Sequence, residues 1–207
     1  RRVLFRSRRR LIVALVSAPV WLASGAGLAQ GADALSQMQQ ARQTLAALGM
    51  ARLEGFSTQL RAAIVQADAA LRGRRWAAVL DALKPLESVA PLEQVPSYDA
   101  QLLASAAYLG LGDAARAARH HALAQAMREL LLARLGDAKT PRTALQILMV
   151  NDLVEWASLK GLRILGMKGF MSRGRPAYEI TYRPDEGQGL DAQAYAQFDE
   201  RIAAARR

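Results

Sequence analysis

The chain has 207 residues, no cysteine and a formal net charge of +10. The lack of cysteine excludes disulfides, thiolate metal sites and cysteine nucleophiles. The first 29 residues hold six arginines and no acid, so residues 30–207, with 22 basic and 18 acidic residues, carry a net charge of only +4. A nucleic-acid surface needs a clustered basic stripe, and we therefore expect no nucleic-acid partner.

The first 29 residues have the three-part layout of a bacterial export signal. A basic segment at Arg1–Arg10 precedes an apolar segment at Leu11–Ala23 and a small-residue segment at Ser24–Ala29. A membrane span needs about 20 apolar residues, so the shorter run favours a signal cleaved before Gln30 over a retained anchor. We expect a periplasmic or secreted protein that meets the membrane only through this segment.

Two export routes fit the basic segment. Ser7-Arg8-Arg9-Arg10-Leu11-Ile12 is similar to a twin-arginine motif. However, Leu4–Ser7 matches the translation of a common sequencing adapter, which would make Ser7 foreign to the protein. We therefore favour the ordinary Sec route and keep the twin-arginine route as the alternative.

Residues 30–137 have the composition of a helical lobe. Alanine, leucine, glutamine and arginine, all good helix formers, dominate this stretch. Apolar residues recur at helical spacing between breaks that contain glycine or proline. The pattern predicts helices over 33–48, 52–71, 75–88, 98–110 and 114–135.

Within this lobe, residues 98–124 carry a tetratricopeptide-like signature. Tyr108 is followed by Leu111-Gly112-Asp113, and Ala117 and Ala124 come at the spacing that lets two helices approach closely. The preceding pair of helices, with Trp76 near its turn, is similar but looser. Two repeats are fewer than the three or so that a free-standing solenoid needs, so we expect these helices to pack on a second element.

That second element is predicted at residues 138–207. Ala144–Val150 is a short apolar run typical of a buried strand, and Asp152–Leu159 predicts a short helix. Two further strands are predicted at Leu162–Met171 and Ala177–Arg183. The tail after Leu190 fits either a helix or a third hairpin strand. The fold class is α+β, mostly α, with helical hairpins on a small antiparallel sheet that carries one short helix.

Residues 98–199 resemble a family of uncharacterised bacterial proteins with tetratricopeptide-like helices and a small C-terminal sheet. The resemblance rests on features in order along the chain: Ala107-Tyr108, Leu111-Gly112-Asp113, His121, Gly136-Asp137, Lys139-Thr140-Pro141-Arg142-Thr143-Ala144, Asp152, Gly161-Leu162, Tyr178-Glu179-Ile180 and Phe198-Asp199. It departs from the family at Asp152-Leu153-Val154, where consecutive acids and an aromatic are usual. The resemblance implies that Phe198-Asp199 lies on or just after an edge strand, and it implies no activity.

The sequence contains few candidates for catalytic or metal-binding residues. His120 and His121 are adjacent on a predicted helix, so they point about 100° apart and cannot chelate one metal ion. We expect His121 to pack into the preceding helix and His120 to face solvent. Asp152 and Glu155 share a helix face, which favours a helix cap over a cation site. We predict no metal ion and no cofactor.

Two function classes remain open. The repeat-like helices and the lack of a catalytic set favour a binding module for an unknown protein or peptide, through the helical face or the sheet edge. Trp156, Tyr178 and Tyr182 are aromatic candidates for an interaction surface, with core packing as their alternative. The second class is an envelope hydrolase or metal-dependent enzyme that uses His121 with an acid such as Asp152.

Overall fold

A computed structural model describes residues 26–133, 138–172, 174–185, 190–199 and 202. Most of the predicted export signal, including Leu4–Ser7, lies outside these residues, as do Gly136-Asp137 and the last five residues. Helix α1 begins at Ala26, within the final residues of the predicted signal. Among the described residues, none of the helices combines the length and hydrophobicity needed to cross a bilayer.

Six α-helices and two 3-10 turns occupy the described chain, close to the predicted ranges. The elements of the helical lobe are α1 (Ala26–Ala46), α2 (Met50–Arg72), α3 (Trp76–Leu83), η1 (Lys84–Ser88), η2 (Leu92–Gln94), α4 (Tyr98–Gly110) and α5 (Ala114–Ala133). The predicted third helix is divided because Pro85 follows α3 and the chain tightens into η1. Helix α6 (Val150–Leu159) belongs to the C-terminal lobe.

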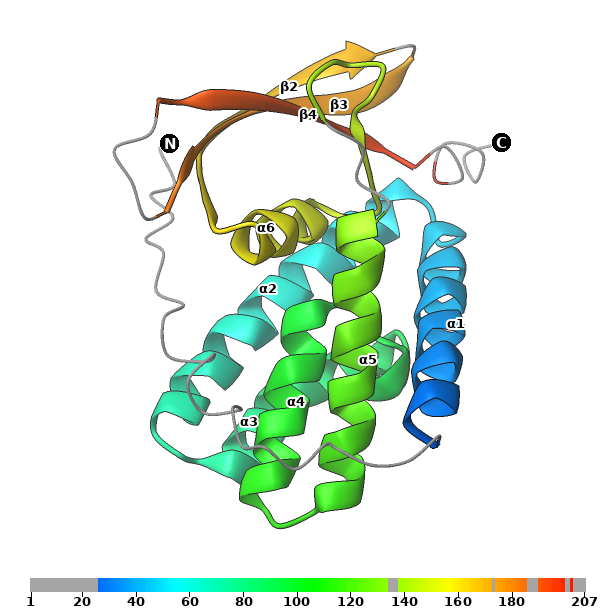
Figure 1. Cartoon of the computed structure of the whole chain (residues 1–207), viewed down its shortest axis with the longest axis vertical. Coiled ribbons are helices and arrows are strands. Elements are labelled where there is room, and N and C mark those ends of the chain that lie inside the picture. The colour runs from blue at the N-terminus through cyan, green and yellow to red at the C-terminus, as the bar shows by residue number, and fades with distance from the viewer. Residues whose placement is uncertain (1–25, 134–137, 173, 186–189, 200–201, 203–207) are drawn as a thin grey trace.

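Helices α2 to α5 pack as successive neighbours, whereas α1 packs mainly on α5 (Figure 1). The α1–α5 contact is a separate small core around Met38, Leu123 and Met127.

The turn between α4 and α5 uses Gly112 at a φ of +81°, a left-handed conformation that glycine adopts without strain. At the end of α4, Gly110 packs directly against the Trp76 ring. A Cβ added to Gly110 would lie 2.3 Å from Trp76 Cδ2, so a larger residue does not fit there. Whether these hairpins are tetratricopeptide repeats stays a prediction.

The C-terminal lobe is a four-stranded sheet that arches over α6 (Figure 1). Its strands are β1 (Leu145–Ile147), β2 (Leu162–Ser172), β3 (Arg175–Pro184) and β4 (Ala192–Phe198), in the order β1-β4-β3-β2. Strands β2, β3 and β4 are antiparallel, and β1 runs parallel to β4. The tail therefore forms a strand, but not the edge strand that the resemblance implied, because β1 pairs with its other side.

The two faces of the sheet differ. Tyr178, Ile180 and Tyr182 alternate along β3 on the face toward α6, opposite Ala196, Ala194 and Ala192 of β4. The small alanines leave room for the tyrosine rings, since directly paired residues point to the same face. Glu179, Thr181 and Arg183 lie on the outer face.

The fold class is confirmed as α+β and mostly helical, with one correction. The sheet is mixed, not wholly antiparallel, because the predicted strand at Ala144–Val150 shortens to Leu145–Ile147 and pairs in parallel. Val150 is the first residue of α6. The sequence did not show where the strand ends, because a continuous apolar run has no periodicity that distinguishes a strand from a helix. The predicted lobe boundary at 137/138 borders residues 134–137, which are not described. One apolar core nevertheless includes α2, α3 and α4 together with α6 and the sheet.

Candidate functional site

The two histidines exchange the environments predicted for them. His120 is 1% exposed, whereas His121 is only half-buried and lies 3.5 Å from the Gln125 amide nitrogen. The predictions for both histidines were therefore wrong. The helical period through Ala117, His120, Ala124 and Met127 contains the correct signal, since all four are buried at spacings of three or four.

His120 is held as a neutral ring by its neighbours. The amide nitrogen of Gln101 donates to the carbonyls of Leu92 and Val95, at 2.7 and 2.8 Å, so its Oε1 is an acceptor. His120 Nδ1 lies 2.7 Å from this Oε1 and therefore carries the proton. Burial lowers the pKa of His120. The ring also stacks on Tyr108, at 5.3 Å between centroids. His120 thus joins α4 and α5 as a packing residue.

Asp152 is enclosed by hydrogen-bond donors. Both guanidinium nitrogens of Arg42 donate to it, Nη1 to Oδ1 at 3.1 Å and Nη2 to Oδ2 at 2.8 Å. The backbone N–H of Leu148, just before α6, donates to Oδ2 at 2.7 Å. Burial opposes the charge of Arg42, but the carboxylates of Asp152 and Glu155 outweigh it and raise the pKa of the guanidinium. Asp152 therefore holds the segment that enters α6 and ties α1 to α6, but no described side chain caps α6, so the predicted cap by Asp152 is not observed.

Glu155 caps a different helix. Its carboxyl accepts hydrogen bonds at the start of α4 from the Ser97 hydroxyl at 2.5 Å, the Tyr98 N–H at 3.0 Å and the Asp99 N–H at 3.3 Å. Ser97 in turn accepts from the N–H of Ala100. Burial, with the charges of Asp99 and Asp152, raises the pKa of Glu155 to about 8 against the lowering effect of its donors. No feature of the sequence showed that residue 155 would meet residue 97.

These groups form one closed polar cluster, which we name the buried junction: Arg42, Ser57, Ser97, Asn151, Asp152 and Glu155. The Ser57 hydroxyl adds a link from α2 by donating to Asn151 at 2.9 Å. No buried polar side-chain atom of the described chain lacks a hydrogen-bond partner. In the same residues, no three acidic or histidine side chains are placed to hold a metal ion. The junction holds α1, α2, α4 and α6 together.

The predicted pairing of His121 with Asp152 is not observed. No hydrogen bond or ion pair joins them, and Asp152 is 2% exposed and occupied by Arg42. Both carboxylate oxygens of Asp152 already accept donors. The arrangement gives Asp152 no open position from which to take a proton from a substrate.

The three aromatic candidates lie in the packing between the sheet and α6. Trp156 is 7% exposed and meets Tyr182 edge to face, at 6.3 Å between centroids. Tyr178 meets Phe198 at 5.9 Å. Both tyrosines are partly buried against the main core. Core packing, the alternative considered for them, is what the structure has, and they do not form an exposed patch.

Sequence reasoning missed a surface on β2. This strand is last in the sheet order, so the side of its backbone away from β3 pairs with no other described strand. It carries exposed apolar side chains at Leu165, Met167 and Met171, which are 42%, 38% and 66% exposed. We name this surface, the unpaired side of Leu162–Ser172 with its side chains, the β2 edge.

The free side of β4 is covered, and the opposite border of the sheet is the three-residue strand β1. The N–H of Tyr195 in β4 donates to the carbonyl of Ala138, at 2.8 Å, and the N–H of Asp199 donates to Ile147. The loop before β1 and β1 itself therefore saturate β4. Long open edges are usually blocked in this way because they template pairing with another chain. The β2 edge is the longer border, at eleven residues, and its register shifts once, between Ile164 and Gly166.

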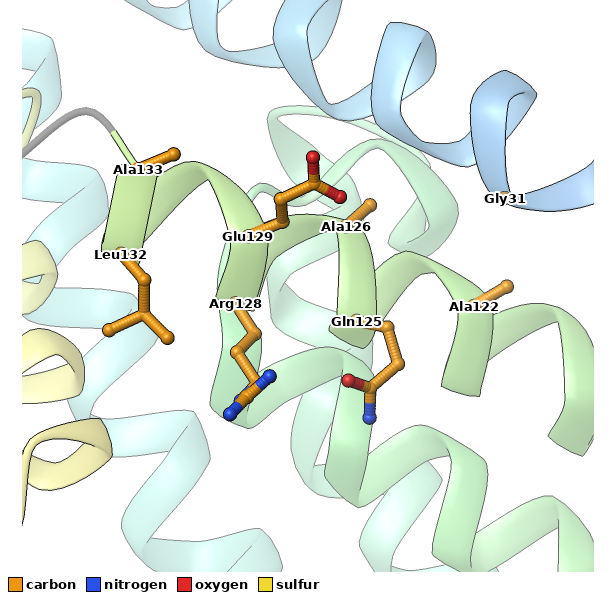
Figure 2. Close-up of a pocket in the computed structure, with 8 residues that line it drawn as sticks. All are labelled: Gly31, Ala122, Gln125, Ala126, Arg128, Glu129, Leu132 and Ala133. Carbon is orange, nitrogen blue, oxygen red and sulfur yellow. The ribbon is translucent and has the colours of Figure 1, made fainter. Parts of the chain in front are cut away.

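A groove of about 650 Å³ between α1 and α5 is the other surface candidate. Its lining residues come from Gly31 and from α5, and Figure 2 shows that their polar groups diverge. Glu129 points toward α1, whereas Arg128 and Gln125 point the other way. Polar groups that do not converge cannot orient a ligand, so this groove does not define a site.

Comparisons with known proteins identify no relative: no protein-family model, no curated protein and no solved structure matches this chain. The resemblance to exported proteins with tetratricopeptide-like helices therefore stays a prediction.

Proposed function

We propose that this protein is an exported, non-enzymatic binding module of the cell envelope, and that it binds an extended segment of a protein or peptide along the β2 edge. The observation that carries the proposal is the length of β2, eleven residues, which pairs with no described strand on one side, whereas the other border of the sheet is the three-residue strand β1. An extended peptide that adds to such an edge gains main-chain hydrogen bonds, and its alternate side chains set the specificity.

The helical lobe serves in this proposal as the support of the sheet. Its hairpins, which we infer to be degenerate tetratricopeptide repeats, pack beneath α6 and share one core with β3 and β4. Of the two candidate enzymatic groups, Asp152 is paired with Arg42 in the interior, and His121 lies beside Gln125 instead of beside Asp152. A rigid support matters because strand addition needs an edge that is already in place before the partner arrives.

Site-specific photo-crosslinking in cells of the organism that encodes the chain tests this function. A photoreactive residue at Met171, on the β2 edge, is expected to give a reproducible protein adduct in the envelope fraction. The matched control is Val65 on α2, which is 65% exposed against 66% for Met171. Adducts of equal yield at both positions, or none at either, would contradict the proposal.

The compartment is tested in the same cells. Export through a cleaved signal is expected to yield an envelope protein whose measured mass is that of a chain beginning at Gln30. A product of full mass retained in the cytoplasm would contradict the export prediction and leave the β2 edge unaffected.

A further inference from the structure

The net charge of residues 30–207 is concentrated in the hairpin beside the β2 edge. The hairpin of β2 and β3, residues 162–184, has five basic residues and one acid, a net charge of +4. Residues 30–207 as a whole also have a net charge of +4, so the remainder of that part of the chain is balanced. An excess of one sign on a single hairpin attracts partners of the opposite sign.

The basic side chains that the structure describes in this hairpin share one face of the sheet. Lys168 pairs with Glu179, Arg163 with Arg183, and Ser172 with Arg175. Since paired residues point to the same face and Glu179 and Arg183 lie on the outer face, Arg163, Lys168 and Arg175 lie there too. None of these three makes an ion pair with any described residue, whereas Arg183 is paired with Asp191 at 2.7 Å.

The two methionines of the edge belong to the other face. Met167 pairs with Ile180, which points toward α6, and Met171 pairs with Pro176 two steps further along the same alternation. Met171 is nevertheless 66% exposed, so the inner face of the sheet continues past the part that the core covers. A strand laid beside β2 therefore meets cations and Phe170 on one face and methionines on the other.

We propose that the partner is an extended acidic segment of another protein, in which acidic residues alternate with apolar ones and which adds to β2 as a fifth strand. This inference rests on the proposed function and specifies its partner. The acidic residues face Arg163 and Lys168, and the apolar residues extend the layer of Met167 and Met171. Side chains of an added strand alternate between the two faces with a period of two, which fits this division of charge and hydrophobicity.

A second copy of the chain fits the edge less well. Pairing β2 with β2 of another copy would bring together two hairpins that each carry +4. Like charges placed across neighbouring strands are destabilising. An anionic membrane surface would match the basic face, but it would leave the backbone N–H and C=O groups of the edge without strand partners.

Fluorescence anisotropy with the purified protein and a labelled peptide tests the partner chemistry. The probe has about nine residues, enough to pair with most of β2 at a strand rise of 3.3 Å per residue, and glutamate alternates with valine along it. It is expected to bind at least about tenfold more tightly than a peptide in which lysine alternates with valine, and to weaken with added salt. Equal affinity for both peptides would overturn the proposal.

Backbone methylation of the probe tests strand addition without altering the protein. In a peptide that adds to one edge, every second N–H faces the edge. N-methylation of one alternating set of amides is expected to abolish binding, and methylation of the other set to preserve it. Loss with both sets, or with neither, would overturn the strand geometry.

Charge removal from the protein locates the site. The variant R163Q/K168Q is expected to bind the glutamate–valine probe about tenfold more weakly. The matched control R52Q/R142Q removes the same charge from exposed residues on α2 and on the loop before β1, and is expected to bind like the parent. Circular dichroism confirms that both variants are folded, and equal weakening in the two would overturn the assignment to β2.

Two further measurements distinguish the other occupants. Sedimentation with vesicles of phosphatidylglycerol and phosphatidylethanolamine is expected to leave the protein in the supernatant, and sedimentation velocity is expected to show a monomer. Vesicle binding lost in R163Q/K168Q, or a dimer that excludes the probe, would overturn the acidic-peptide partner. If the probe fails while the Met171 crosslink persists, the partner chemistry is wrong and the binding function stands.

Discussion

The buried junction and the β2 edge differ in whether their charged side chains are paired within the described chain. At the junction, Arg42 and Asp152 are paired in the interior at 2.8 Å, with side chains 11% and 2% exposed. At the edge, Arg163 and Lys168 are exposed and make no ion pair with the described chain. A buried charge without a partner is costly, whereas an exposed one costs little. Folding therefore satisfies the first set completely and leaves the second available to a partner.

The comparison separates stability from binding. The junction connects four helices from distant parts of the sequence, since Arg42 and Asp152 are 110 residues apart. Its residues should therefore control the free energy of unfolding. The β2 edge packs little of its surface, and its residues should control affinity with little effect on stability.

The largest expected effect is the loss of the guanidinium at the junction. Arg42→Ala leaves Asp152 buried without its cation, and such a broken pair costs about 3–5 kcal/mol. Urea denaturation measures the change in the free energy of unfolding. The matched control is Arg72→Ala, which removes an exposed pair with Asp68 and is expected to cost less than about 1 kcal/mol. Equal costs for the two variants would show that the buried junction contributes no more to stability than an exposed ion pair does.

The next effect is a pH dependence that originates at Glu155. Its pKa is about 8 in the folded chain, because of burial, against an ordinary value of 4.5. Between these values the folded chain holds a proton that the unfolded chain has released. The free energy of unfolding should therefore fall as the pH rises from about 4.5 to 8, by up to about 1.4 kcal/mol per pH unit from this group.

Urea titrations at several pH values check this slope against a variant. In Glu155→Gln, the free energy of unfolding is expected to decrease less with rising pH, because the amide does not titrate. Leu153→Val, on the same helix and 0% exposed, is the control, since it should lower stability equally at every pH. A slope that is unchanged in Glu155→Gln would place the titrating group elsewhere.

The smallest expected effect is at the edge itself. Met171→Lys is expected to change the free energy of unfolding by no more than about 0.5 kcal/mol, because the side chain is 66% exposed. The same change at Met127, which is 0% exposed, should abolish folding or cost more than about 4 kcal/mol. Thermal denaturation compares the two variants with the parent. A large loss at Met171 would mean that the edge is part of the core.

Much of the fold could be predicted because its signals are local. The predicted helix ranges agree with α1, α2, α4 and α5 to within a few residues at most of their ends, since helical periodicity and glycine breaks are properties of short segments. The alternation of Tyr178, Ile180 and Tyr182 likewise located β3. The tail was ambiguous because alanines serve in both a helix and a strand. Pairing with β3 and β1 resolved it in favour of the strand.

The candidate site was predicted poorly because its properties are not local. His121 was chosen over His120 from the spacing of a motif, while the apolar positions around them indicate His120. Asp152 and Glu155 were identified as a shared helix face, but their partners Arg42 and Ser97 come from other helices. The β2 edge went unnoticed because sequence gives the alternation of a strand without its place in the sheet.

The sequence by itself determined the helices, the strands and the balance of charge, because propensity, period and residue type act over a few neighbours. The tertiary structure alone decided which charges are enclosed and which are open. Arg42 and Arg163 are the same residue type, and only the packing of α1 against α6 pairs the first with an acid. The strand order β1-β4-β3-β2 leaves the second beside an unpaired edge, since the register of distant segments fixes both outcomes.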